Sequence, residues 1–341
     1  MTLFLDIIAF LLGLVLIVKG ADWLTDGAAN IAHRFHIPTL VIGLTIVAIG
    51  TSAPEFVVSL VGALRHSPDI AIGNVVGSNI FNILGIIGCT ALVTPIAMTR
   101  SNVLRDLPIM VIATFALFFM LIDRVLDSEA TSNALTRGDG LVLLCLFAMF
   151  MYYTVRMAKK GRKQANAQEE ETHIAKLPDW LPAFFKRHSL LTYIAMIILG
   201  LTCLIYGGNI MVTGASSIAR SLGVSEAIIA LTIVSIGTSA PELATSLMAA
   251  HKGDNAMVVG NIVGSVVFNT LLILGASALV CPLPMTGITM TDLYVLLGAA
   301  VLFWLDSKFG KGHYTITRIE GAVMVLLQVA YYVYLIIQEG I

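Results

Sequence analysis

The chain has 341 residues, of which 57% are hydrophobic and only 12% are charged. Together with a mean hydropathy of +0.91, this composition excludes an ordinary soluble domain and is typical of a polytopic membrane protein. The formal net charge of −1 says little, because the charges of a membrane protein are sorted by loop and do not act as one field. No nucleic-acid function is predicted.

Ten apolar stretches are long enough to cross a bilayer as helices. They lie at 3–21, 38–63, 70–93, 107–123, 139–157, 190–212, 225–250, 256–280, 290–306 and 318–338. The first has no basic residue before it and no cleavage pattern after it, so we interpret it as a span and not as a signal peptide. The polar stretch 158–189 separates five spans from five and is predicted to be a linker.

The basic residues predict the orientation of these spans. If the amino terminus is external, the loops after the odd-numbered spans are cytoplasmic, and they hold sixteen of the twenty Lys and Arg residues. The four others are Arg65, Arg124, Arg137 and Arg220. This positive-inside bias predicts that both termini are extracytoplasmic and that the linker is cytoplasmic.

One hexapeptide, Gly-Thr-Ser-Ala-Pro-Glu, occurs at 50–55 and returns letter for letter at 237–242, an offset of 187 positions. The same offset relates the flanking segments 43–88 and 230–275, which indicates two copies of one unit. Because five spans is an odd number, the second copy must enter the membrane inverted. We therefore predict an all-α polytopic membrane protein with ten transmembrane helices as two inverted five-helix repeats, at 1–157 and 190–341. Such repeats are typical of secondary transporters.

Each copy carries a carboxylate deep inside a predicted span. Glu55 and Glu242 occupy equivalent positions there, where a charge is costly and marks a functional site by default. No Lys or Arg stands at matching depth, so a cation from solution is the predicted partner. The proline before each glutamate also deprives the carbonyl four residues back of its helical donor. Free oxygens are therefore expected beside each carboxylate.

The histidines and cysteines narrow the choice of ion. All seven histidines fall in loops or at span edges, and the four cysteines have no metal-type spacing. A site inside the membrane must then use oxygen, which favours hard cations such as calcium or sodium. Neutral oxygens recur every four residues along one face of each following span, at Asn74, Ser78 and Asn82 and at Asn261, Ser265 and Asn269.

The paired Gly-Thr-Ser-Ala-Pro-Glu segments are each followed by Gly-Asn-x-Val-Gly-Ser-x-x-Phe-Asn. They resemble the two alpha-repeats of the cation/calcium exchanger superfamily, on its sodium/calcium exchanger branch. The resemblance implies alternating access in which the first and sixth spans slide over a core of eight. It implies that Glu55 and Glu242 are the central calcium ligands, helped by the backbone carbonyls of Thr51 and Thr238. It further implies sodium sites and a completed centre at Ala48, Ser52, Ser78, Asn82, Ser235, Ser239, Ser265 and Asn269.

One position departs from part of this family. Some relatives carry Asp at the place of Asn269, whereas here both halves have Asn, so the site holds two acidic groups. The ion ratio and any potassium co-transport stay open for that reason. The short linker also leaves no room for the calcium-sensing domains of animal exchangers.

The favoured function is antiport of Ca²⁺ against Na⁺ across the cell (inner) membrane, normally as calcium efflux. A Ca²⁺/H⁺ antiporter of the same fold is the alternative, because buried carboxylates also bind protons. An intramembrane enzyme is disfavoured, because no span pairs a Ser with a His as a nucleophile and base would require. No cofactor is predicted beyond the transported ions. The predicted partners are these ions and the lipid bilayer, and the sequence specifies no protein partner.

Overall fold

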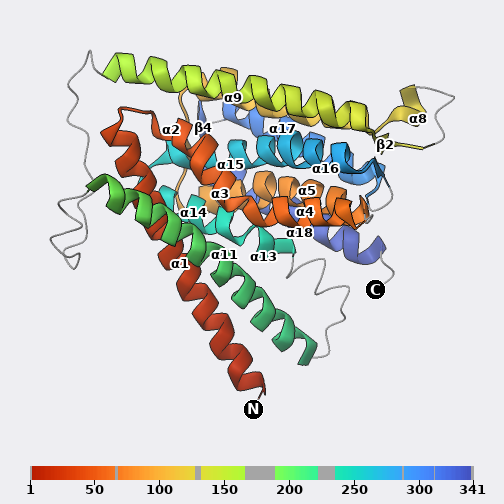
Figure 1. The fold of residues 1–341 in the computed structure, drawn as a ribbon, viewed down its shortest axis with the longest axis horizontal. Helices are drawn as coiled ribbons and strands as arrows, with labels where there is room; N and C mark the ends of the chain where they lie inside the picture. The colour runs from red at the N-terminus through yellow and green to blue at the C-terminus, as the bar shows by residue number, and fades with distance from the viewer. Residues whose placement is uncertain are drawn as a thin grey trace.

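Figure 1 shows the computed structural model of the chain, which describes residues 2–65, 68–126, 132–165, 189–221, 235–285, 288–310 and 312–338. The first half contains α1 (Thr2–Arg34), α2 (Thr39–Ile42), η1 (Gly43–Val47), α3 (Ala48–Thr51), α4 (Ala53–Leu64), α5 (Pro68–Ile80), η2 (Phe81–Ile86), α6 (Ile87–Val93), β1 (Ile96–Ala97), η3 (Asn102–Asp106), α7 (Leu107–Met120), α8 (Asp123–Leu126), β2 (Ala134–Leu135) and α9 (Arg137–Ala165). The second half contains α11 (Ser189–Ser221), α13 (Ser235–Thr238), α14 (Ala240–His251), α15 (Asn255–Val267), η5 (Phe268–Ile273), α16 (Leu274–Val280), β3 (Leu283–Pro284), α17 (Met290–Phe309), β4 (Thr315–Ile316) and α18 (Arg318–Gln338).

The predicted helical membrane fold is confirmed. Within the described ranges, eight helices are long and apolar enough to cross a membrane, and the bent pair Thr39–Thr51 and Ala53–Leu64 makes a ninth crossing. The first part of the seventh predicted span lies outside the described residues, and its described part is α13 and α14. Most of the predicted linker also lies outside them. The count of ten spans therefore stays a prediction.

Three helices are longer than the hydropathy pattern predicted. The prediction ended the first span at 21 and the sixth at 212, but α1 continues to Arg34 and α11 to Ser221. Likewise α9 continues to Ala165, into the stretch predicted as linker. In Figure 1, α1 and α11 are steeply inclined to the other helices, and an inclined helix needs more residues to cross the same thickness.

Glycines allow α1 and α11 to run side by side in opposite directions. A Cβ at Gly20 would lie 2.8 Å from the carbonyl oxygen of Gly200, and one at Gly13 would lie 2.7 Å from that of Gly207. Such positions let helix backbones approach closely in a membrane. The antiparallel pairing means that the first helix of each half enters from the opposite side, as inverted repeats require. Asp6 adds a cross-link by accepting a 2.7 Å hydrogen bond from Ser217.

The centre of the molecule is formed by the repeat-related helices α5–α6 and α15–α16. In the most apolar window of Asn255–Val280, 94% of residues are buried, and in that of Ile70–Val93 the share is 83%, against 17% for α1. Glycines bring these helices close to their neighbours, since a Cβ at Gly260 would lie 3.0 Å from the Cα of Gly43. The central helices therefore form the scaffold on which the two broken spans lie.

The helices are interrupted at repeat-related positions. Ser52 separates α3 from α4 with φ −82° and ψ 9°, and Ser239 separates α13 from α14 with φ −90° and ψ 7°. Both breaks lie two residues before a proline, which is the second residue of the following helix and needs no helical donor there. The π-helical turns η2 and η5 are also related by the offset of 187, and such turns often occur at functional sites.

Short polar motifs begin several of the peripheral helices. At the starts of α9, α17 and α18, the backbone N–H of a threonine donates a hydrogen bond to the carboxylate of the residue three positions later. Thr289 and Asp292 of α17 form a complete capping box of this kind. Two antiparallel two-residue ladders, β1 with β4 and β2 with β3, each join a segment of one half to a segment of the other. These ladders were not predicted.

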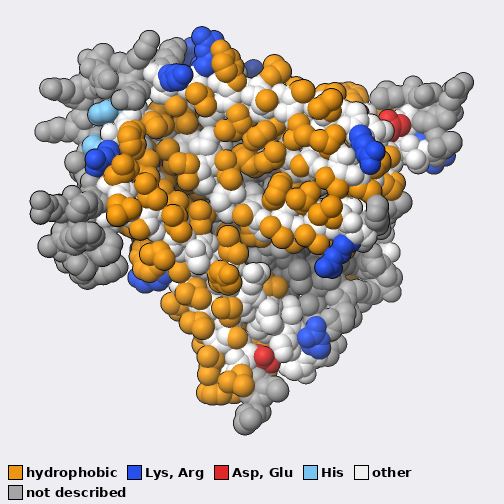
Figure 2. All heavy atoms as spheres, in the orientation of Figure 1, with side chains coloured by type: hydrophobic (Ala, Val, Ile, Leu, Met, Phe, Trp, Pro, Cys, Tyr) orange, Lys and Arg blue, Asp and Glu red, His pale blue; other side chains and the backbone are white. Residues whose placement is uncertain are grey.

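Charge is sorted on the surface as a membrane protein requires. Figure 2 shows hydrophobic side chains over the broad middle of the visible face, with Lys and Arg mostly near its margins. Exposed apolar residues such as Phe4, Val57, Met149 and Leu326 would face water in a soluble protein. Exposed apolar area of this extent fits contact with lipid tails.

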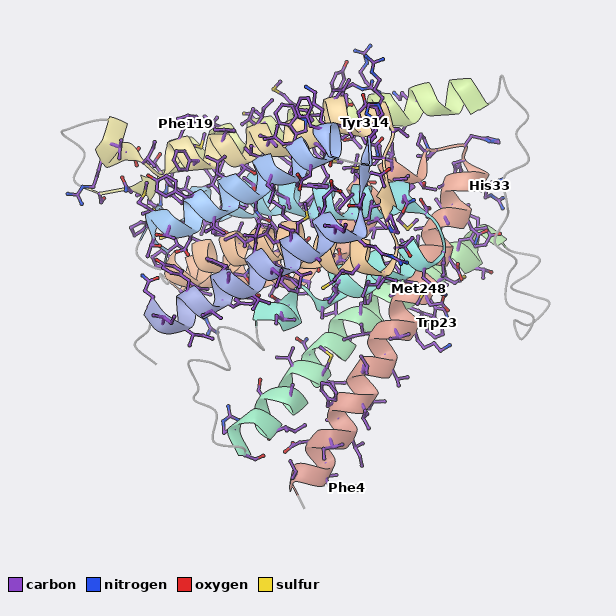
Figure 3. All side chains as sticks on the ribbon, turned by 180° about the vertical axis from the view of Figure 1, so that it is seen from behind. Phe4, Trp23, His33, Phe119, Met248 and Tyr314 are labelled. Atoms are coloured by element: carbon purple, nitrogen blue, oxygen red, sulfur yellow. The ribbon has the colours of Figure 1, made fainter. Side chains whose placement is uncertain are left out.

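One contact distinguishes the two halves. α1 packs along α14, and Figure 3 shows both helices from behind, with Trp23 labelled on the first and Met248 on the second. At the end of α14, the Nζ of Lys252 lies 2.7 Å from Asp22 and 2.8 Å from Asp26. The repeat-related face of α4 is barer, because Val57 is 58% exposed and Val61 38%, whereas their counterparts Ala244 and Met248 are half-buried. The structure therefore has α1 in contact with α14, while the related face of α4 is more exposed.

Candidate ion-binding site

The two glutamates begin the second halves of the broken spans. Glu55 lies in the first turn of α4 and Glu242 in the first turn of α14, and both are buried, at 0% and 1% exposure. The N-terminus of a helix favours negative charge, so each break places a carboxylate beside favourably oriented backbone N–H groups.

Serines from one half bind the carboxylate of the other. The hydroxyl of Ser52 donates a 2.8 Å hydrogen bond to Oε1 of Glu242. Its counterpart Ser239 lies 3.3 Å from Oε1 of Glu55 and 3.2 Å from the hydroxyl of Ser78, which itself lies 3.4 Å from the same carboxylate oxygen. These crossed contacts bring the two sequence motifs into one site between the halves.

Two asparagines form hydrogen bonds with the helices that carry the glutamates. Asn74 donates to the backbone carbonyl of Glu55 at 3.2 Å and to Ser59 at 2.9 Å. Asn261 makes the equivalent contacts with the carbonyl of Glu242 at 3.3 Å and with Ser246 at 3.0 Å. The first residue of each predicted polar stripe therefore positions the helix that carries the glutamate, and the carboxylate oxygens stay available for other contacts.

Several buried oxygens at this place have no hydrogen-bond partner among the described residues. They are Oε2 of Glu55, Oε2 of Glu242, Oδ1 of Asn82, Oδ1 of Asn269 and Oγ of Ser265. Buried polar atoms are normally paired, and five oxygen atoms left over in one region are what a desolvated cation would bind. Asn82 and Asn269 each occupy the second position of a π-helical turn.

The remaining predicted residues lie around this centre or outside the description. Thr51 is buried and donates its hydroxyl to the carbonyl of Val47 at 3.0 Å, so its backbone carbonyl is the better candidate ligand. Ala48 is buried where a Cβ at Gly264 would touch it. Thr238 ends α13 and is half-buried. Ser235 begins α13, but its side chain lies outside the described residues.

The chemistry of the site is that of oxygen alone. In the described part of the chain, no group of three or more His, Cys, Asp or Glu residues is placed to hold a metal. Two carboxylates supply a formal charge of about −2 and up to four oxygens, with hydroxyl, amide and carbonyl oxygens beside them. Calcium takes about six to eight such ligands. The set suits a hard cation.

Sequence reasoning missed one buried group beside the centre. Asn79 on α5 accepts a 3.1 Å hydrogen bond from Nδ2 of Asn269 and donates a 2.9 Å bond to the hydroxyl of Thr270. Its counterpart at the offset of 187 is Val266, and that of Thr270 is Ile83. Because this pair is absent from the duplicated pattern, the repeat gave no signal for it. A buried amide adjacent to Ser78 was the available clue.

The fold and the site together define a class of protein. Two inverted halves, each with a broken membrane helix, place two carboxylates in one buried oxygen site, which is the arrangement of a secondary transporter for cations. The family model described as sodium/calcium exchanger protein matches residues 5–156 and 192–338. The chain belongs to the sodium/calcium exchanger family, and the predicted family is thereby confirmed.

Individual relatives agree with this assignment. The putative antiporter CaxA of Alkalimonas amylolytica is 36% identical over 94% of this chain and 95% of its own length. The inner membrane protein YrbG of Escherichia coli is 36% identical over 86% of each chain. The sodium/calcium exchanger MaX1 of Methanosarcina acetivorans is 29% identical over 97% of this chain and 98% of its own.

A solved structure shows the same fold. The sodium-calcium exchanger NCX_Mj, soaked with zero Na⁺ and Ca²⁺, matches with a TM-score of 0.79 and 29% identity, over 98% of this chain and 99% of that chain. In crystals soaked with 2.5 mM Na⁺ and 0.1 mM Ca²⁺ the TM-score is 0.77 at 30% identity, over 97% of each chain. This chain is accordingly a multi-pass membrane protein of a cation/calcium exchanger family.

Proposed function

We propose that the protein exchanges Ca²⁺ for Na⁺ across the membrane by alternating access. The observation that carries this proposal is the buried carboxylate pair, Glu55 and Glu242, contributed by opposite halves and surrounded by oxygens without other partners. The names of MaX1 and NCX_Mj, which are exchangers of these two ions, support the same choice.

The proposed ligands are those that the resemblance to the family implies. Glu55 and Glu242 bind calcium at the centre, and the backbone carbonyls of Thr51 and Thr238 add neutral oxygens on either side. Sodium ions use subsets of the same region, at Ala48, Ser52 and Ser78 and at Ser235, Ser239 and Ser265. The amide oxygens of Asn82 and Asn269 complete the centre.

Exchange follows from mutual exclusion at this shared site. One calcium ion, or two sodium ions, neutralises two carboxylates, and a third sodium held by neutral oxygens makes the exchange electrogenic. An empty site would carry two like charges in a medium of low dielectric constant, so it resists moving between the two sides of the membrane. Only a loaded site then switches, and the ion with the larger gradient drives the other.

The α1–α11 pair is the proposed moving part. Its two helices contact each other through closely spaced glycines, while the central helices α5–α6 and α15–α16 are mostly buried. A rigid pair sliding over such a core exposes the glutamates first to one side and then to the other. We place the protein in the inner membrane with both termini extracytoplasmic, where the inward sodium gradient drives calcium efflux.

The proposal is tested with purified protein in sodium-loaded vesicles. Uptake of labelled calcium is expected on dilution into sodium-free medium, and Glu55→Gln and Glu242→Gln should each reduce it at least a hundredfold because a buried cation loses a charged ligand. Asp139→Asn, which alters a carboxylate capping α9 at the surface, is the matched control and should transport normally.

The coupling ion is tested in the same vesicles. Sodium and proton gradients are imposed separately, and calcium uptake is expected only with the sodium gradient. Calcium uptake driven by a pH gradient in the complete absence of sodium would replace Na⁺ by H⁺ in the proposal. Unchanged uptake by both glutamate variants would refute the site itself.

A further inference from the structure

The centre of the site departs from the symmetry of the two repeats at one place. Asn82 and Asn269 are repeat-related, and the Oδ1 atom of each is buried without a hydrogen-bond partner among the described residues. Only Asn269, however, donates its Nδ2 to a second buried amide, that of Asn79, at 3.1 Å. The residue related to Asn79 is Val266, which cannot accept such a bond.

Asn79 is itself anchored on its other side. Its Nδ2 donates a 2.9 Å hydrogen bond to the hydroxyl of Thr270, which follows Asn269 directly in η5. Asn79, Asn269 and Thr270 are all 0% exposed, so no bulk water competes for these bonds. The three side chains form a short chain of hydrogen bonds that links α5 of the first half to η5 of the second.

This chain determines which end of the Asn269 amide is available. An asparagine amide carries a donor end and an acceptor end. Because the Oδ1 of Asn79 takes the NH₂ group of Asn269, the Oδ1 of Asn269 is left free. A cation needs that oxygen and is repelled by an NH₂ group. Asn79 accepts from the NH₂ group of Asn269 and donates to the hydroxyl of Thr270, so it holds Asn269 in this orientation while being held by Thr270.

We propose that Asn79 is a positioning residue for cation binding: its amide holds Asn269 so that the carbonyl oxygen of Asn269 faces the cation. The inference rests on the proposed function in one respect, namely that Asn269 is a ligand. The proposal adds Asn79, which has no counterpart in the other repeat, to the residues of the site. It also makes the side-chain amides of Asn82 and Asn269 inequivalent. Asn269 is preorganised, whereas Asn82 lacks this brace.

The test separates affinity from transport rate. Calcium binding to detergent-solubilised protein is measured by isothermal titration calorimetry, and transport is measured in sodium-loaded vesicles. Asn79→Leu, which is similar in size and has no polar atoms, should raise the calcium Kd about tenfold, the effect of losing a buried hydrogen bond. The maximal transport rate at saturating calcium should stay within about twofold, since Asn79 itself does not bind the ion.

Two further variants keep the test decisive if Asn79→Leu does not fold. Thr270→Val removes only the anchoring hydroxyl and should raise the Kd about threefold, while Thr270→Ser restores the hydroxyl and should return the Kd to that of the native protein. Val266→Ala, at the place related to Asn79, is the control for packing and should leave the Kd unchanged.

The outcomes distinguish this inference from the proposed function. If Asn79→Leu and Thr270→Val both bind calcium as the native protein does, the positioning role is refuted even when Glu55→Gln abolishes transport. If a sodium gradient drives no calcium uptake in the native protein but the two variants still weaken calcium binding, the coupling proposal fails and the positioning role stands. A fall in maximal rate at unchanged Kd would also overturn the inference, because it would show that Asn79 acts on the conformational change.

Discussion

Lys252 is expected to stabilise the arrangement in which α1 lies against α14. Its ammonium group lies 2.7 Å from Asp22 and 2.8 Å from Asp26, two carboxylates one turn apart on α1, and 2.9 Å from the hydroxyl of Thr25. If α1 and α11 slide over the rest of the molecule, these contacts must break in each transport cycle. Replacement by Met keeps the length of the side chain and removes the charge.

The expected size of the Lys252→Met effect follows from how exposed the three charged side chains are. The side chains of Lys252, Asp22 and Asp26 are 27%, 35% and 27% exposed, and exposed ion pairs each contribute about 0.5 kcal/mol. Two pairs therefore amount to about 1 kcal/mol, which corresponds to about a fivefold change in the ratio of two conformations. High salt should reduce the effect, because solvent ions screen partly exposed charges.

Spin-label distances measure this ratio directly. One label replaces Val15 on α1 and the other replaces Met149 on α9, which are 57% and 67% exposed, in a variant without the four cysteines. The ratio of molecules with the native spin-label distance to molecules with the alternative distance should fall about fivefold in Lys252→Met. It should stay constant in Lys252→Arg, which keeps the charge.

A second lysine supplies the control for loss of charge. Lys308 lies at the end of α17, with its ammonium group over the ring of Trp304, so Lys308→Met should leave the spin-label distances unchanged. Identical distance distributions in Lys252→Met and the native protein would refute the reasoning. They would mean that α1 is held against α14 by apolar packing alone.

Two further predictions concern packing and hydrogen bonding. Gly20→Ala should lower the thermal midpoint and impair transport, because its Cβ would lie 2.8 Å from the carbonyl oxygen of Gly200. Gly298→Ala is the control: no atom lies within 4 Å of its Cβ, so the higher helix propensity of Ala should raise the midpoint. A higher midpoint in Gly20→Ala would contradict close packing of α1 on α11. Tyr331→Phe removes the 2.8 Å hydrogen bond to buried Asp292 and should cost about 1–3 kcal/mol of stability, measured by thermal unfolding. Tyr294→Phe is the control, because Tyr294 is 57% exposed. Equal thermal midpoints for Tyr331→Phe and Tyr294→Phe would show that the hydrogen bond between Tyr331 and Asp292 does not stabilise the protein.

The duplicated motif made most of the site predictable. Since 50–55 and 237–242 are identical, any inverted arrangement that joins them must bring Glu55 and Glu242 to one place. The serine contacts between the halves then follow from the three-residue spacing of Ser52 and Glu55 in both copies. That these residues bind ions is still a prediction, because geometry alone does not identify a ligand.

The features that escaped prediction depend on pairs far apart in sequence. Hydropathy ended the first span at 21, yet α1 continues to Arg34, and its additional turns carry Asp22 and Asp26, which contact Lys252 more than two hundred residues away. The π-helical turns also left no signal, since one additional residue in a helical turn does not alter an apolar run. Asn79 was missed because reasoning from duplication finds only what occurs twice.

Sequence differences between the two halves determine which of the two conformations has the lower energy. If two inverted repeats were identical, the states open to either side would have equal energies, and no side would be preferred at rest. Here the residues related to Lys252, Asp22 and Asp26 are Arg65, Asn209 and Thr213, so the related positions on α11 carry no carboxylate. The arrangement with α11 against α4 therefore lacks both ion pairs, and its energy should be higher by about 1 kcal/mol from this source. A carboxylate introduced by Asn209→Asp supplies one ion pair, so it should offset about half of that difference and move the spin-label populations in the same direction as Lys252→Met. If Asn209→Asp instead leaves the populations unchanged, the two closed arrangements are not related by the repeat symmetry.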